Sequence, residues 1–101
     1  MRWVEIISVR LIGEPDIPAM RGVVQAFGAL SGENTPTGLR LYHHATVESD
    51  VSIHIHWNRA SQDLPRKSPL GLRIADVIGE FGMVNHAIWI DDTGKNPSSP
   101  V

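Results

Sequence analysis

The chain has 101 residues, contains no cysteine and carries a formal net charge of -2 with histidine neutral. This length is typical of one domain, and the missing cysteines exclude disulfide scaffolds, thiolate metal sites and cysteine nucleophiles. The balanced charge, the missing secretory leader and the lack of any apolar run near about 18 residues predict a cytoplasmic protein with no nucleic-acid or membrane partner.

The first part of the chain predicts a buried strand followed by an amphipathic helix. Residues 3–12 are rich in Ile, Val and Leu, which is typical of a strand buried on both faces. Asp16 can cap a helix that begins at Ile17-Pro18, because its carboxylate can accept a backbone N–H of the first turn. Apolar residues then recur at three- and four-residue steps as far as Leu30, before a polar loop over residues 31–38.

The middle of the chain predicts a β-hairpin. Apolar and polar residues alternate over residues 39–48 and again over residues 51–58, with a turn near Ser49-Asp50. The apolar set is Leu39, Leu41, Ala45, Val47, Val51, Ile53, Ile55 and Trp57. We expect this set to lie beneath the helices.

The last part of the chain predicts a second helix and a final strand. Ser68-Pro69 is a helix start, the apolar stripe ends near Phe81, and Gly82 stands where a left-handed cap is expected. Residues 83–90 form the last strand, and residues 93–101 are expected to be a flexible tail. The order strand, helix, strand, strand, helix, strand predicts a ferredoxin-like α+β fold over residues 1–92, with a four-stranded antiparallel sheet and both helices on one face.

The other face of this sheet has no cover within the chain. Because side chains alternate along a strand, Ser52, His54, His56 and Asn58 point away from the helices. The neighbouring strands add Arg40, Tyr42, His44, Thr46, Ser8 and Arg10. A second copy related by a two-fold axis is the simplest cover, so we expect a homodimer.

Histidines are the main candidates for chemistry on this face. His54 and His56 would lie about 7 Å apart on one side of a strand. The length of the turn decides whether His43 or His44 lies opposite His56, and we favour His44 because it keeps the apolar residues of its strand together. We consider His44, His54 and His56 as general bases, as ligands of a transition metal, or as hydrogen-bonding residues of an interface.

Other polar residues are candidates for ligand binding. Arg10 stands in an aliphatic strand, so it should meet either a carboxylate or an anionic ligand. Tyr42 and Trp57 are packing residues with a polar tip, and His86 on the last strand is either a satisfied buried histidine or part of a pocket. Glu5, like the other acidic residues, is expected to be solvated or to cap a helix.

The element order and size resemble the dimeric α+β barrel superfamily, whose best-known branch is the antibiotic-biosynthesis monooxygenases. The resemblance covers residues 3–91 and implies a barrel of two sheets, with a ligand pocket between each sheet and its helices or loops. It also implies cofactor-independent oxygenation or a related isomerisation, with a histidine as general base. The haem-degrading branch uses an Asn on the first strand, a Trp on the third and a His on the next helix. Trp57 matches, but residues 3–12 contain no Asn and residues 58–81 contain no His.

Three functions follow from this sequence. The leading one is a homodimeric, monooxygenase-like protein without a cofactor, whose histidine-lined pocket binds a small aromatic or anionic ligand. Its ligand-binding candidates are Arg10, Tyr42, Asn58, Trp57 and His86. The alternatives are a non-enzymatic dimerisation or ligand-sensing module and a histidine metal-binding protein.

Overall fold

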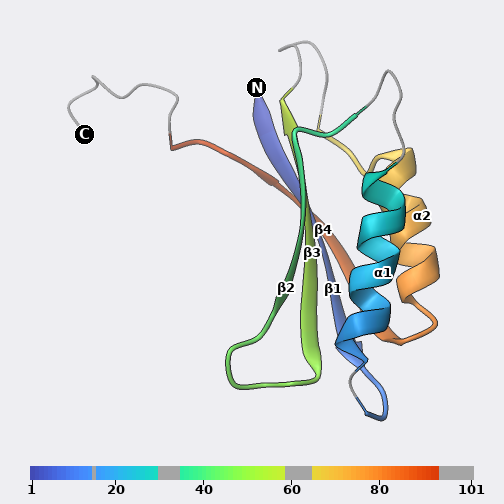
Figure 1. Ribbon diagram of the computed structural model, residues 1–101. Coiled ribbons are helices and arrows are strands. Elements are labelled where there is room, and N and C mark those ends of the chain that lie inside the picture. The colour runs from blue at the N-terminus through green and yellow to red at the C-terminus, as the bar shows by residue number, and fades with distance from the viewer. Residues whose placement is uncertain (15, 30–34, 59–64, 94–101) are drawn as a thin grey trace.

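Four strands and two helices alternate in the predicted order. The computed structural model describes residues 1–14, 16–29, 35–58 and 65–93, so the predicted tail lies outside the described residues from position 94 onward. The elements are β1 (Arg2–Leu11), α1 (Ile17–Gly28), β2 (Gly38–His43), β3 (Asp50–Asn58), α2 (Pro69–Ile78) and β4 (Gly82–Ile90). All strand pairs are antiparallel in the order β2-β3-β1-β4, and both helices cover one face of the sheet (Figure 1). The predicted ferredoxin-like fold is confirmed.

The two helix starts are as predicted. Asp16 Oδ1 accepts a hydrogen bond from Ala19 N at 3.0 Å, and Ser68 Oγ accepts one from Gly71 N at 2.9 Å. Each side chain thereby satisfies a backbone donor that the first helical turn leaves free.

The predicted left-handed cap at Gly82 is wrong. Helix α2 ends at Ile78, and the residue after it, Gly79, has right-handed backbone angles. Gly13, in the turn after β1, is the glycine with a positive φ among the described residues. Gly82 instead begins β4, where a Cβ atom would overlap the backbone carbonyl of Arg10. Close approach of two strands, rather than a helix cap, requires glycine at this position.

The strand register divides the sheet into two faces that differ in chemistry. On the covered face, next to the helices, lie Trp3, Glu5, Ile7 and Val9 of β1, Val51, Ile53, Ile55 and Trp57 of β3, and Val84, His86 and Ile88 of β4. On the open face lie Val4, Ile6, Ser8 and Arg10 of β1, Arg40 and Tyr42 of β2, His54 and His56 of β3, and Met83 and Trp89 of β4. The apolar core is therefore one layer between the covered face and the helices.

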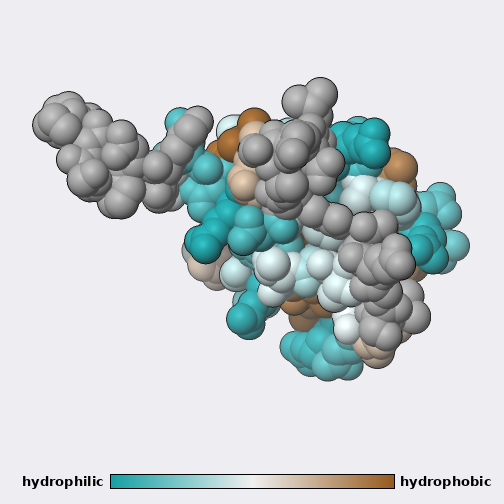
Figure 2. All heavy atoms as spheres, turned by 90° about the horizontal axis from the view of Figure 1, so that it is seen from above, coloured by the Kyte–Doolittle hydropathy of each residue, from teal (hydrophilic) through white to brown (hydrophobic). Residues whose placement is uncertain are grey.

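The end of the molecule at which β1 begins is largely hydrophilic when viewed from above (Figure 2). Neither helix of the described chain has the length and apolar character that crossing a membrane requires.

Candidate functional site

A buried carboxylate lies on the covered face, in the half of β1 nearer its start. Glu5 is completely buried, and its Oε1 accepts hydrogen bonds from Trp57 Nε1 at 2.8 Å and from Ser68 N at 3.1 Å. Its Oε2 lies 2.8 Å from His86 Nε2, whose side chain is only 6% exposed. We call Glu5, Trp57, Ser68 and His86 the Glu5 cluster. It joins β1, β3, β4 and the start of α2 through a group that would be costly to bury without partners.

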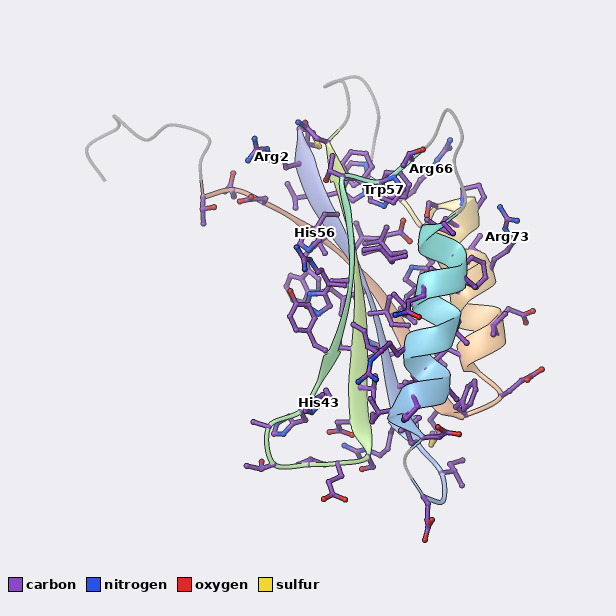
Figure 3. The ribbon with its side chains drawn as sticks, in the orientation of Figure 1. Arg2, His43, His56, Trp57, Arg66 and Arg73 are labelled. Carbon is purple, nitrogen blue, oxygen red and sulfur yellow. The ribbon has the colours of Figure 1, made fainter. Side chains whose placement is uncertain are left out.

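Helix α2 covers the Glu5 cluster at a glycine. A Cβ atom on Gly71 would overlap Glu5 Oε2 and would stand 3.1 Å from His86 Cε1. The helix can therefore rest directly on the carboxylate and the imidazole only because residue 71 has no side chain. Figure 3 shows Trp57 on this side of the sheet, between the strands and the helices.

The carboxylate of Glu5 also orients the imidazole of His86. When the Nε2–H group of His86 donates a hydrogen bond to Glu5 Oε2, the neutral ring carries its lone pair on Nδ1. An imidazole held in one tautomer by a buried carboxylate is an arrangement used for general bases. The sequence left the orientation of His86 open, and the structure places it on the covered face as a hydrogen-bonded buried histidine.

Trp3 provides an unused donor beside the Glu5 cluster. Its side chain is 6% exposed, and its Nε1 is buried without a hydrogen-bond partner in the part of the chain that the structure describes. Its ring stacks on Trp57, with the ring centroids 6.4 Å apart. A buried donor without an acceptor costs about 1–3 kcal/mol. The acceptor of a bound molecule would remove that cost.

His54 is the central histidine of the open face. Its Nε2 lies 2.8 Å from Ser52 Oγ, and its ring centroid lies 4.5 Å from that of Tyr42 and 6.3 Å from that of His56. Partial burial, and to a lesser degree the neighbouring His56, lowers the pKa of His54 below its ordinary value. His54 is therefore an uncharged acceptor or donor at neutral pH.

Arg10 is used within the chain. Its Nε donates to Asp50 Oδ1 at 3.1 Å, and this hydrogen bond, together with the charge of Asp50, raises the pKa of Arg10. Of the two predicted roles, the structural ion pair is the one observed.

The expectation that His44 lies opposite His56 on the open face is wrong. Strand β2 ends at His43, and Gly38 is the residue opposite His56. His44 Nδ1 accepts hydrogen bonds from Thr46 N at 3.1 Å and from Val47 N at 3.0 Å, so its side chain holds the turn instead of extending the strand.

His43 has the covered-face register opposite Val51 but is exposed at the end of β2. Neither histidine of this pair therefore joins His54 and His56. Among residues 1–14, 16–29, 35–58 and 65–93, no group of three metal-ligating side chains is close enough to hold a metal ion.

The predicted site residues thus divide between the two faces. Trp57 and His86 lie in the Glu5 cluster, whereas His54, His56, Tyr42 and Asn58 belong to the open face. Glu5 was not among the predicted site residues, because an acidic residue was expected to lie in solvent or at a helix cap. The strand alternation that places Trp3 and Ile7 in the core also places Glu5 there, and this pattern could have identified it.

Two hollows border the open face. One of about 560 Å³ is bounded by Ser8, Arg10, Tyr42, Ser52 and Met83. The other, of about 550 Å³ at the opposite end of the sheet, is bounded by Arg2, Arg40, His56 and Asn58 and also by Trp3 and Trp57.

Comparison with known proteins supports the fold without naming a family. No protein-family model matches the chain, and no curated protein matches it in sequence. A structure of SnoaB, a cofactor-independent oxygenase from Streptomyces nogalater, is similar with a TM-score of 0.63 and 12% identity, over 90% of this chain and 93% of that one.

Two further solved structures share the fold. One is a protein of unknown function from Bacteroides thetaiotaomicron described as a possible oxidoreductase, with a TM-score of 0.62, 13% identity, and coverage of 89% of this chain and 97% of that one. The other is a dimeric protein of unknown function with a ferredoxin-like fold from Bacteroides fragilis, with a TM-score of 0.52, 8% identity, and coverage of 89% and 96%. At these identities the likeness concerns the fold alone.

Proposed function

We propose that this chain is a homodimeric enzyme that acts on a small molecule by base catalysis, in the manner of a cofactor-independent monooxygenase. The observation that carries the proposal is the pairing of His86 with the buried Glu5 beside the unused N–H of Trp3. The fold similarity to SnoaB is consistent with this class of reaction. His86 is the general base, and Glu5 is the residue that positions it.

The substrate class is inferred from the groups beside the Glu5 cluster. Trp3 offers one N–H donor and the two stacked indoles offer flat apolar surfaces, which suits an aromatic ketone whose carbonyl oxygen accepts the hydrogen bond. Nδ1 of His86 removes a proton from a methylene group that the carbonyl activates. The resulting carbanion adds to O₂, the peroxide takes up a proton, and loss of water leaves a second carbonyl. Glu5 is completely buried and the side chain of His86 is only 6% exposed, with Gly71 of α2 packed against both, so the proposal includes an outward shift of α2 that admits the substrate.

In this proposal the open face is the dimer interface. Met83 is 73% exposed, Trp89 62% and Tyr42 48%, and all three lie on this one face. Large apolar side chains gathered on one sheet face are typical of an interface. A similar solved structure is described as dimeric, so we propose a second copy of the chain as the cover.

Oxygen uptake with anthrone as the probe tests the proposal, because its methylene group is activated by a ring carbonyl. We expect His86→Gln to lower kcat by about 100-fold or more, which is the usual contribution of a general base. Glu5→Gln keeps the shape of the side chain but loses the charge, so it should lower kcat less. His43→Gln, an exposed histidine away from the cluster, is the control. Circular dichroism of each variant checks that the fold is intact.

His54 is the second candidate for the base, because its lowered pKa keeps it uncharged at neutral pH. If turnover were lost in His54→Gln but retained in His86→Gln, the general base would be His54 on the open face. Absence of enzymatic oxygen uptake above the background rate would contradict the oxygenase proposal itself.

A further inference from the structure

The hollow at the end of the open face where β1 begins gathers hydrogen-bond donors. Arg2 and Asn58 are partners in the β1–β3 register, and Arg40 and His56 follow on β2 and β3. These four side chains bound a space of about 550 Å³. Figure 3 shows Arg2 and His56 on the side of the sheet that faces away from the helices. The groups therefore come from three strands but share one surface.

The positive charge in this hollow is poorly neutralised. Arg40 has no acidic partner among the residues that the structure describes, in contrast to Arg10, which pairs with Asp50 at the other end of the same face. Asp91 is the acidic residue that bounds the hollow, and its Oδ1 already accepts hydrogen bonds from Thr93 N and Thr93 Oγ1. These bonds, together with the charge of Arg2, lower the pKa of Asp91. A chain with net charge -2 thus keeps a local positive excess here.

The backbone around the hollow is well fixed. Thr37 N and Thr37 Oγ1 both donate to the carbonyl oxygen of His56, at 2.8 Å and 3.1 Å. Gly38 has no side chain, and a Cβ atom on Gly38 would stand 3.5 Å from His56 Cδ2. The imidazole of His56 therefore rests against β2 at this glycine. Both Arg40 and His56 are therefore carried by regular strand rather than by a loop.

We propose that this hollow is a binding site for a small oxyanion group, a carboxylate or a phosphate of an organic molecule. Arg40 binds two oxygens of the group in a bidentate manner, and Arg2, His56 and Asn58 supply further donors. Arg2, Arg40, His56 and Asn58 lie on the open face, away from Glu5 and His86, although Trp3 and Trp57 also line the hollow. The inference uses no step of the proposed oxygenase reaction. In a dimer formed through the open face, a bound anion would also neutralise Arg40 at the interface.

Calorimetric titration of the full chain with benzoate, and separately with inorganic phosphate, tests this site at constant ionic strength set with sodium chloride. We expect saturable binding of at least one of the two, weakened about tenfold or more in Arg40→Gln. Arg10→Gln is the matched control, because it removes an arginine of the same face that is already paired, and should bind as the wild type does.

The two probes distinguish the sources of the oxyanion. Binding of benzoate alone identifies a carboxylate site, and binding of phosphate alone identifies a phosphate site. Absence of saturable binding to either probe, or equal affinity in wild type and Arg40→Gln, would overturn the inference. Sedimentation measurements on the same samples report the oligomeric state separately, so that a monomer that binds the anion refutes only the dimer.

Discussion

The two faces of one four-stranded sheet treat their polar residues in opposite ways. On the covered face, Glu5 and His86 are buried and every oxygen of the carboxylate has a donor. On the open face, His54 is half-buried, His56 is exposed, and Arg40 has no acidic partner in the described chain. The same alternation of side chains along β1 and β3 produces both arrangements. On the covered face the carboxylate of Glu5 and the imidazole of His86 are paired within this chain, and the N–H of Trp3 is the donor left over. On the open face Arg10 is paired with Asp50, whereas Arg40 has no acidic partner among the described residues.

This difference separates the two kinds of work that we propose. A base must be held in one tautomer away from bulk water, and the Glu5 cluster meets that requirement. A surface that binds another molecule must leave donors and apolar area available, as the open face does. Substitutions that affect one face and leave the other intact test whether this separation is real.

The largest effect is expected at the contact between α2 and the Glu5 cluster. In Gly71→Ala, the new methyl group overlaps Glu5 Oε2, so either the helix moves outward or the carboxylate loses its partners. We expect the free energy of unfolding to fall by about 3 kcal/mol, measured by urea denaturation.

Gly22→Ala is the matched control for this prediction. Gly22 lies in α1 with open space where its Cβ atom would stand, so alanine should raise stability by about 0.5–1 kcal/mol through helix propensity. If both substitutions changed the stability equally, close packing of α2 on Glu5 would not be a determinant of the fold.

A smaller effect is expected at the apolar part of the open face. Trp89→Ser removes a side chain that is 62% exposed in the single chain, so monomer stability should change little. A dimer formed through the open face would bury Trp89 of both copies. We therefore expect the dissociation constant of the dimer to rise about tenfold or more in the variant. Sedimentation velocity across a concentration series measures this change. Ile12→Ser, which removes a 75% exposed residue just beyond the end of β1, is the control, and equal effects of the two would contradict the proposed interface.

The fold was predictable from sequence because hydrophobic periodicity is a local property. The switch from a helical repeat to strict alternation near Leu39 predicted the hairpin, and Asp16 and Ser68 predicted both helix starts. The prediction for His44 failed because its imidazole accepts hydrogen bonds from the backbone of the turn that follows. Strand β2 therefore ends at His43, four residues before Val47, which was expected to belong to the strand. Such side-chain bonds compete with strand pairing and do not alter the hydrophobic pattern.

The Glu5 cluster was not predictable in the same way. The partners of Glu5 are 52, 63 and 81 residues away along the chain, so no local motif links them. A glutamate in a strand is usually exposed, so its residue type predicted an exposed side chain although its position in the alternation of β1 predicted a buried one. His86 and Trp57 were identified as candidates, but only the tertiary structure brings them to one carboxylate.

The smallest effect is expected from the titration of His54. Its pKa in the folded state is lowered below the ordinary value of 6.5 by burial and by His56, so between these two values the unfolded chain binds more protons than the folded one. Stability should therefore decline as the pH falls below 6.5, and His54→Gln should remove that part of the decline. Urea denaturation of both proteins from about pH 7.5 to about pH 5 measures the difference. Identical pH profiles would show that His54 is solvated as freely in the folded chain as in the unfolded one, and the open face would then offer no base that is set apart from an ordinary surface histidine.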